Sequence, residues 1–329
     1  ARQTPRQKTP LDVFHPASLG LVDGRRRVQP ISPVRGRPAV FSAAVLMVVL
    51  ALPAISDGQT APPRTEWGAP DLRGLWNHGT ATPLERPERH AGRERLTPDE
   101  VAAVNADARS SAGDLARRAV WWERGLSDGR TAMIVDPADG RIPSTEAADA
   151  RRRREPHVDG PEGRNLWERC ITSGVPRLGG VYLQNIHLLQ TPDHVVMLHE
   201  MIHEFRVIPL DGRPHLPATV PQWLGSSRGR WEGDTLVVET RHFAPGQLYR
   251  GVSQESVRLT ERFSVIDTDT IGYTVTFEDP DLWTQPWTAV MSMPRTPGPM
   301  FEYACHEGNV GMKNTLEIAR GEEAARVPR

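Results

Sequence analysis

The sequence predicts a mainly all-β protein, an antiparallel β-barrel behind an N-terminal helical and irregular extension. From about residue 182 onward, short apolar runs are separated by turn residues, which is typical of antiparallel strands. Within residues 273–278, apolar and polar side chains alternate, which indicates one dry and one wet face. The 329 residues include 30 Pro and 28 Gly, and this composition suits one soluble unit with many turns.

The N-terminal part of the chain predicts export. Residues 39–56 are apolar and follow a basic stretch, and Pro53 with small residues around it supplies a cleavage site. We expect residues 34–58 to be a signal peptide that starts at Val34, and residues 1–33 to be a non-native upstream extension. A membrane anchor is the alternative, because about 18 apolar residues are just enough to span a bilayer. Cleavage would leave no stable membrane span.

The net charge and the motifs of the chain exclude several classes of binding partner and reaction. Residues 1–58 hold eight Lys/Arg and three Asp/Glu, which leaves 32 basic and 38 acidic residues and a net charge of −6. Such a mature chain has no electrostatic reason to bind nucleic acid or an anionic membrane. The sequence has no Gly-rich phosphate loop, GxSxG elbow or CxxC pair, which argues against nucleotide binding, α/β-hydrolase chemistry and thiol redox chemistry. We expect a small-molecule ligand or substrate.

The two cysteines of the chain, Cys170 and Cys305, predict one disulfide. An exported protein meets an oxidising environment, so each cysteine has one obvious partner. We therefore expect a periplasmic or secreted protein, with two free buried thiols as the alternative.

Residues 59–165 predict one strand and several helices. Residues 71–77 suit a first short strand. Thr97 and Glu100 form a capping box, which predicts a helix that runs to about residue 109. A second helical piece is expected over residues 114–124, and a surface helix followed by a loop within residues 144–164.

Residues 166–315 predict the barrel, followed by a C-terminal tail over residues 316–329. The expected strands are residues 182–190, 195–201, 205–209, 235–240, 257–266, 270–278, 287–293 and 300–305. Sequential antiparallel strands with short links favour a closed barrel, because closure removes exposed edges. A two-sheet sandwich is the alternative architecture.

Several segments resemble a large, uncharacterised family of exported bacterial proteins that is abundant in soil bacteria. They are residues 71–77, 82–87, 133–137, 139–143, 168–170, 200–203, 208–217, 229–239 and 302–309. The resemblance implies one fold unit and export, and it brings no catalytic assignment. The Gly74-x-Trp76 pattern is also similar to the start of lipocalin-like barrels.

His199, Glu200 and His203 form an HExxH motif, which on a helix would make a zinc hydrolase site. Glu232 or Glu239 is a candidate third ligand. On a strand, however, Glu200 would lie on the opposite side from both histidines. In the family that the chain resembles, Glu200 and His203 have counterparts, whereas His199 usually has none. We therefore favour no metal and no other cofactor, and keep zinc as an alternative.

The favoured site is a His/Glu acid–base cluster of Glu200, His203, His306 and Glu307, because burial and mutual charge tune such pairs towards neutral pKa values. Further candidates for ligand contact are Arg206, Arg262, Trp223, Trp287 and Asn309. The sequence thus predicts an exported protein of unknown function that binds or transforms a small, largely apolar molecule in a barrel pocket. The second alternative, beside the zinc hydrolase, is a non-catalytic envelope accessory protein.

Overall fold

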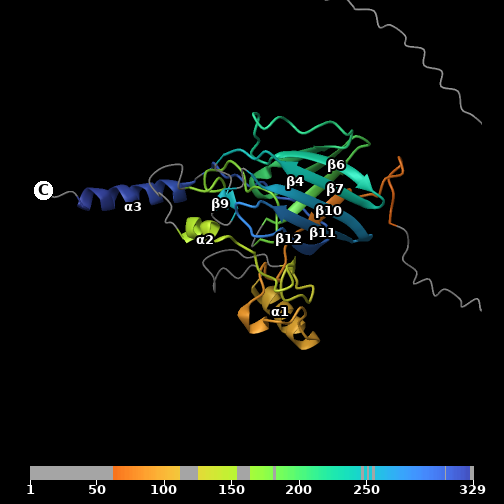
Figure 1. Ribbon diagram of the computed structural model, residues 1–329, viewed down its shortest axis with the longest axis horizontal. Coiled ribbons are helices and arrows are strands. Elements are labelled where there is room, and N and C mark those ends of the chain that lie inside the picture. Colours follow the sequence, from red (N-terminus) through yellow and green to blue (C-terminus); the bar gives the residue numbers. More distant parts are fainter. Residues whose placement is uncertain are drawn as a thin grey trace, which may run out of the picture. The chain divides into compact units, whose positions relative to one another are not determined.

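The computed structural model describes residues 62–111, 125–153, 164–180, 183–245, 248–249, 252–253, 256–307 and 309–326, which belong to one compact unit (Figure 1). The elements are β1 (Gly74–Asn77), η1 (Glu88–His90), α1 (Pro98–Ser111), β2 (Ile134–Asp136), α2 (Glu146–Arg153), β3 (Asn185–Gln190), β4 (His194–His199), η3 (Met201–His203), β5 (Phe205–Pro209), β6 (Ser226–Glu232), β7 (Thr235–Arg241), β8 (Leu248–Tyr249), β9 (Val252–Ser253), β10 (Arg258–Asp267), β11 (Thr270–Glu278), β12 (Trp287–Pro294) and α3 (Val310–Arg326). The signal peptide, the upstream extension and the helical piece predicted at residues 114–124 lie outside the described residues. Within the described part, no helix has the length and apolarity to cross a membrane.

Two antiparallel sheets enclose one hydrophobic core. The four-stranded sheet has the order β1-β3-β4-β5, the six-stranded sheet has the order β2-β12-β11-β10-β7-β6, and β8 pairs with β9. Inward side chains of both sheets belong to one buried cluster, among them Leu188 and Met197 from the first sheet and Phe263 and Val275 from the second. The mainly β prediction is therefore confirmed.

The central strand β11 shows why these segments form a sheet. Ile271, Tyr273, Val275 and Phe277 are buried, while the residues between them are partly exposed. This two-residue period matches a pleated strand with one face on a core. Phe277 also stacks on Trp287 with ring centroids 3.8 Å apart. Trp287, predicted as a ligand contact, is fully buried in this core.

The β6–β7 hairpin turns through Gly233 and Asp234. Gly233 has φ of 58°, a conformation that glycine adopts without steric cost. Trp231 pairs across the hairpin with Leu236 and packs against the core. Strand β6 is not among the strands that the sequence predicted.

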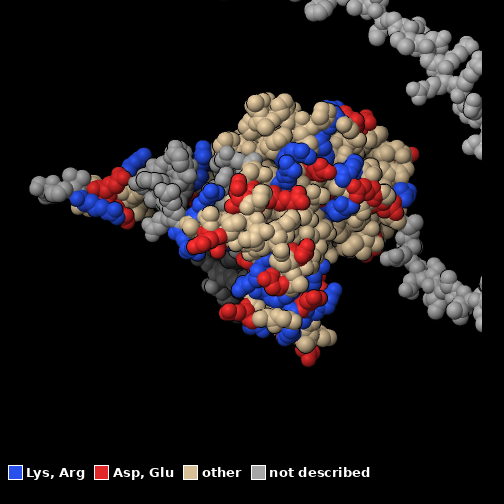
Figure 2. Space-filling model, in the orientation of Figure 1, with Lys and Arg blue, Asp and Glu red and all other residues tan. Residues whose placement is uncertain are grey.

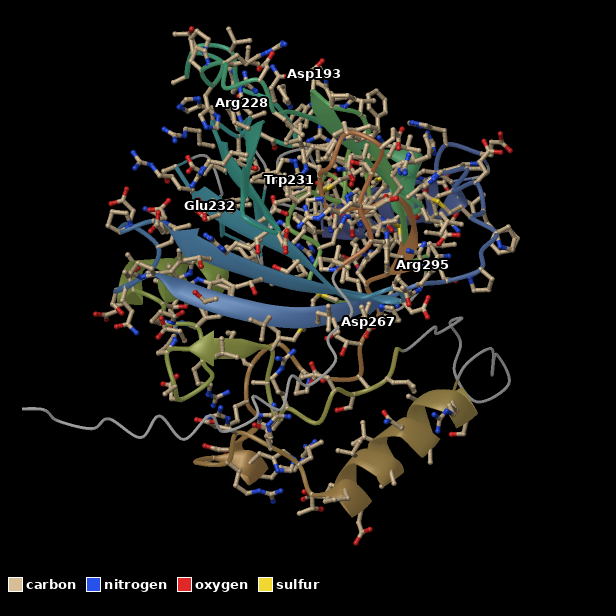
Figure 3. All side chains as sticks on the ribbon, turned by 90° about the vertical axis from the view of Figure 1, so that its right-hand side faces the viewer. Asp193, Arg228, Trp231, Glu232, Asp267 and Arg295 are labelled. Atoms are coloured by element: carbon tan, nitrogen blue, oxygen red, sulfur yellow. A yellow bond between two sulfur atoms is a disulfide. The ribbon has the colours of Figure 1, made fainter. Side chains whose placement is uncertain are left out.

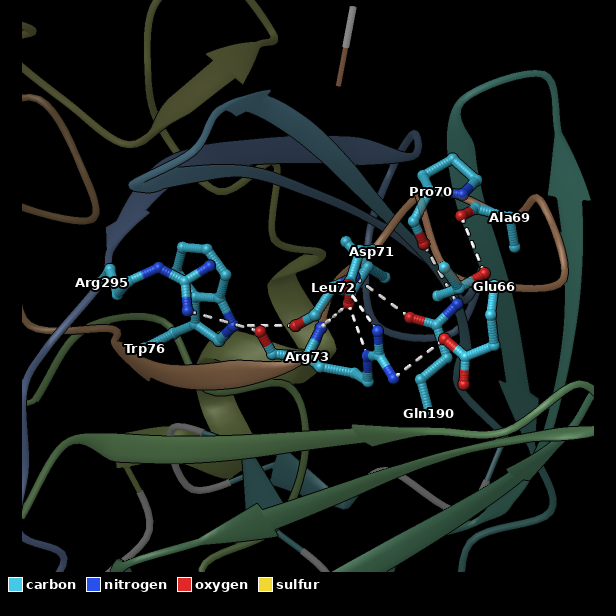
Figure 4. Close-up of polar contacts among 10 residues, drawn as sticks. Glu66, Ala69, Pro70, Asp71, Leu72, Arg73, Trp76, Gln190 and Arg295 are labelled. Atoms are coloured by element: carbon cyan, nitrogen blue, oxygen red, sulfur yellow. Dashed lines mark hydrogen bonds and ion pairs between the residues drawn. The ribbon is translucent and has the colours of Figure 1, made fainter. Parts of the chain in front are cut away.

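The two sheets approach each other at their margins without closing. From β1, Trp76 forms a single bridge with Arg295, and Leu75 O accepts a hydrogen bond from the amide of Thr296 at 2.9 Å. The Arg295 guanidinium also lies 4.2 Å from the centre of the Trp76 ring (Figure 4). At the other margin, β5 lies beside β6 where Gly229 approaches the Ile208 side chain, with no ladder between them. Among the described residues the ladders thus form separate sheets, and no closed barrel is found.

The helices and the C-terminal segment agree only in part with the predictions. The capping box of α1 is confirmed: the Glu100 amide donates to Thr97 Oγ1 at 3.3 Å, and the Thr97 amide donates to Glu100 Oε2 at 2.7 Å. The surface helix predicted within residues 144–164 is α2. The strand predicted at residues 300–305 is wrong, because this segment forms no ladder. The predicted tail is largely helix α3, which has no buried residue.

Candidate functional site

Several predicted site residues meet at one hollow beside the disulfide, which we call the disulfide groove. Its volume is about 300 Å³. It is lined by Cys170, Ile171, Thr172, Ile202, His203, Glu204, Phe205, Trp223, Leu224, Cys305 and His306. The groove therefore receives residues from the loop after β4, the start of β5, the segment before β6 and the segment before α3. The sequence placed His203, His306 and Trp223 among the candidates, and the fold brings these three side chains to the same groove.

The predicted disulfide between Cys170 and Cys305 is confirmed, with their Cα atoms 5.7 Å apart. It joins the loop before β3 to the segment before α3, across 135 residues of chain. The Asn309 side-chain amide lies 3.6 Å from Cys170 Sγ. The disulfide therefore fixes the segment that carries His306 against the sheets.

Removal of this disulfide should destabilise the protein by about 2–4 kcal/mol, and the chain-entropy model gives about 4–5 kcal/mol as the upper figure for so long a loop. The measurement is urea unfolding of the wild type with and without dithiothreitol, beside the Cys170→Ser/Cys305→Ser double variant. The variant should match the reduced wild type and should not respond to dithiothreitol. Equal stability of the oxidised wild type and the double variant would contradict the expectation.

His203 lies in an unusual stretch of backbone. Its φ is 43° and that of Ile202 is 64°, in the left-handed region that is costly for a β-branched residue. Cys170 has φ of 56°, so three of the five non-glycine residues with positive φ in the described chain line the groove. Backbone strain of this kind concentrates at functional sites. The His203 ring is exposed, and its Nδ1 lies 3.1 Å from Tyr303 O.

Glu200 does not join the groove. Its side chain is buried, with Oε2 accepting from the Asn185 amide at 3.2 Å and Oε1 from the Phe301 amide at 2.7 Å. Glu307 is exposed and is not among the residues that line the groove. The predicted four-residue cluster is therefore split, since two imidazoles share a groove while Glu200 holds β3 and the segment before α3 together.

The carboxylate that does line the groove is Glu204, which was not predicted. It pairs with Arg177 and accepts a hydrogen bond from the Thr172 hydroxyl. Both side chains of the ion pair are largely buried, and burial lowers the pKa of Arg177 while Glu204 opposes that shift. No local sequence pattern links these residues, which lie 27 positions apart.

The remaining predicted ligand contacts lie elsewhere. Arg262 pairs with Glu232 on the solvent side of the six-stranded sheet, where Arg230 also binds Glu232 at 2.7 Å. Figure 2 shows acidic and basic side chains intermixed over β6, β7 and β10. Asn309 borders a second cavity of about 460 Å³ on another side of Cys305.

The HExxH segment does not form a helix. His199 ends β4 and is buried, whereas His203 belongs to the short helix η3 and is exposed. Glu232 ends β6, next to Trp231 (Figure 3). Among the described residues, no group of three or more His, Cys, Asp or Glu side chains could hold a metal ion. The helical geometry that the zinc alternative requires is absent from this segment.

Arg206, the last predicted ligand contact, lies inside the core between the two sheets. Its guanidinium makes a bidentate pair with Glu261, at 2.6 Å and 3.1 Å. Glu261 also accepts from the Tyr273 hydroxyl at 2.8 Å. Both members of the pair are almost fully buried, so Arg206 cannot reach a ligand in the groove without breaking this network.

Comparisons with known proteins give no relative for this chain. No family model, no curated protein and no solved structure matches it.

Proposed function

We propose that this is an exported protein that binds a small, largely apolar molecule in the disulfide groove. The observation that carries the proposal is that His203, His306 and Trp223 line one groove with Phe205. Phe205 is 64% exposed and Trp223 is 43% exposed, although both are large apolar side chains. Exposed apolar side chains that surround a hollow are typical of a ligand site.

The shape and chemistry of the groove support a particular ligand class. A volume of about 300 Å³ is at the lower end of small-molecule pockets. Its walls include Ile171, Ile202 and Leu224, while the two imidazoles provide hydrogen-bonding groups. The neighbouring cavity near Asn309 is larger but is lined by the charged residues Arg164, Glu168 and Glu302. The groove therefore suits a molecule with an apolar body and one or two polar groups.

Binding is favoured over acid–base catalysis because each nearby carboxylate already has partners. Glu200 accepts two backbone hydrogen bonds, and Glu204 is bound by Arg177 and Thr172. A general base must be within hydrogen-bond reach of the substrate proton and free to take it. The imidazoles are left as the groups that contact the ligand. The zinc hydrolase has no supporting observation.

The disulfide supports the export part of the proposal, because such bonds form and persist in oxidising compartments. The signal peptide at residues 34–58 and the family resemblance remain expectations. The lipocalin-like barrel is also an expectation, and the groove does not depend on it because its residues lie outside the space between the sheets.

The test is titration of the purified mature protein with Nile red, an apolar dye whose fluorescence rises on binding. We expect Trp223→Ala and Phe205→Ala each to weaken dye binding about tenfold or more, since a buried aromatic contact contributes about 1–3 kcal/mol. His203→Ala and His306→Ala should have smaller effects. Because the aromatic side chains are exposed, their removal should leave folding intact.

The matched control is Ile266→Ala, since Ile266 is also large, apolar and 53% exposed but lies at the end of β10, outside the groove. This variant should bind the dye as the wild type does. Equal binding by the wild type and the Trp223 and Phe205 variants, all folded by circular dichroism, would refute the proposed site.

A further inference from the structure

A third, much smaller cavity lies between the two sheets, apart from the disulfide groove. Its volume is about 20 Å³, enough for one water-sized species. Its polar lining residues are His78, Arg177, His199, Arg206, Glu261 and Tyr273. The Arg177–Glu204 pair separates the two hollows, because Arg177 lines the cavity and Glu204 lines the groove.

Four residues that line this cavity carry buried nitrogens without a hydrogen-bond partner among the described residues. They are Nδ1 of His78, both ring nitrogens of His199, Nε of Arg177 and Nε of Arg206. The side chains of His199 and Arg206 are more than nine-tenths buried. Native proteins rarely leave buried polar atoms unpaired, so several around one cavity indicate a bound small ligand, either water or an ion.

The two arginines determine what that ligand must be. A guanidinium N–H can only donate, so Nε of Arg177 and Nε of Arg206 both require an acceptor. The two nearby carboxylates are already engaged, Glu261 with Arg206 and Tyr273, and Glu204 with Arg177. Of the charged residues that line the cavity, two are cationic and one is anionic. Each arginine is thus matched by one carboxylate, and each still directs an Nε–H donor without an acceptor towards the cavity.

We propose that this cavity binds one small monovalent anion of the size of chloride or bromide. Larger anions such as gluconate are excluded by a volume of about 20 Å³. The anion accepts hydrogen bonds from the Arg177 and Arg206 Nε–H groups and from the His199 ring. This inference is independent of the disulfide groove, because a different set of residues forms each site.

Binding of the anion is coupled to proton uptake at His199. Burial, followed by the charge of Arg177, lowers the pKa of His199, so its ring is neutral and one of its nitrogens is a bare acceptor. An anion beside that nitrogen favours the imidazolium form. The other ionisable groups that line the cavity are His78, Arg177, Arg206, Glu261 and Tyr273. Affinity for the halide should therefore rise as the pH falls, by up to tenfold per pH unit.

The experiment measures thermal unfolding of the full protein while sodium chloride or bromide replaces sodium gluconate at constant ionic strength. The unfolding midpoint should rise in a saturable way with either halide and more steeply at pH 6 than at pH 8. Crystals grown in bromide should give an anomalous scattering peak inside the cavity. Identical midpoints in chloride and gluconate, or a cavity that holds only water in the bromide crystals, would overturn the proposal.

Two substitutions at His199 separate a bound anion from a general salt effect. His199→Gln keeps a hydrogen-bonding side chain that does not titrate, so the halide response should persist without its pH dependence. His199→Phe removes the hydrogen bond from the imidazole and places a bulky apolar ring in the cavity, so the response should be much weaker. A halide response in His199→Phe equal to that of the wild type contradicts the site. If His199→Phe does not fold, the pH profile of His199→Gln and the bromide peak still decide the question.

Discussion

Replacement of Glu261 by Leu should lower the free energy of unfolding by about 3–5 kcal/mol, because it leaves Arg206 as an uncompensated charge in the core. The two side chains are each 3% exposed and form two hydrogen bonds with each other. Tyr273 would also lose the acceptor of its hydroxyl. Urea unfolding, followed by tryptophan fluorescence, measures the loss.

A double replacement tests whether the unpaired charge is the cause. In Arg206→Met/Glu261→Leu no charge is left unpaired, and apolar replacement of a buried ion pair is often neutral or stabilising. Because the hydrogen bond from Tyr273 to Glu261 is still lost, we expect the double variant to remain within about 2 kcal/mol of the wild type. A double variant no more stable than Glu261→Leu would show that charge compensation is not the dominant effect.

The matched control lies on the solvent side of the same sheet. Glu232 pairs with Arg262 and Arg230, but all three side chains are more than a third exposed. Exposed pairs contribute about 0–1 kcal/mol. Glu232→Gln should therefore cost far less than Glu261→Leu, although both remove a carboxylate that binds arginine.

Strands with one buried face were predictable from the sequence. The predicted bounds of residues 205–209 and 270–278 match β5 and β11. In β11, alternating apolar residues identify the half-buried strand. In β5 the buried face includes Arg206, whereas Phe205 and Val207 are exposed, so its apolar run predicted the strand but not which face is buried. Strand β6 was missed because its polar sequence SSRGRWE does not alternate in this way. That strand is specified by pairing with β7, for example Arg228 opposite Glu239, and such pairing is a tertiary effect.

The candidate site was predictable only where composition restricted the possibilities. With two cysteines in the chain, the partner of Cys170 had to be Cys305, and this fixed His306 near the groove. The roles of the acidic residues could not be predicted in this way. Glu204 pairs with Arg177, which is 27 residues away in the sequence, and Glu261 pairs with Arg206, which is 55 residues away. No local sequence pattern indicates either pair.

The second large effect expected is a loss of stability in acid that comes from the buried imidazoles. Burial, followed by the charge of Arg177, lowers the pKa of His78 to about 3, and the same two causes lower that of His199 well below its usual value. In the unfolded chain both rings take up a proton near pH 6.5. Between pH 6.5 and about 3, the unfolded state therefore binds more protons than the folded state.

The direction in which stability changes with pH follows from that difference in proton binding. Stability contributed by the neutral imidazoles is fully present above pH 6.5 and falls as the pH decreases towards 3. For His78 alone, a shift of about 3.5 units corresponds to about 4–5 kcal/mol by pH 3, or up to about 1.4 kcal/mol per pH unit. His199 adds a loss in the same direction.

Urea unfolding at pH 7, 6, 5 and 4 in chloride-free gluconate buffer measures this slope without a bound halide. Because carboxylates also titrate in acid, the informative quantity is the difference between the wild type and His78→Gln or His199→Gln. Each variant should be less sensitive to acid than the wild type by up to about 1.4 kcal/mol per pH unit. His194→Gln, on the partly exposed start of β4, controls for the loss of any histidine. Parallel stability curves for the wild type and both core variants would show that the buried imidazoles do not determine the acid sensitivity.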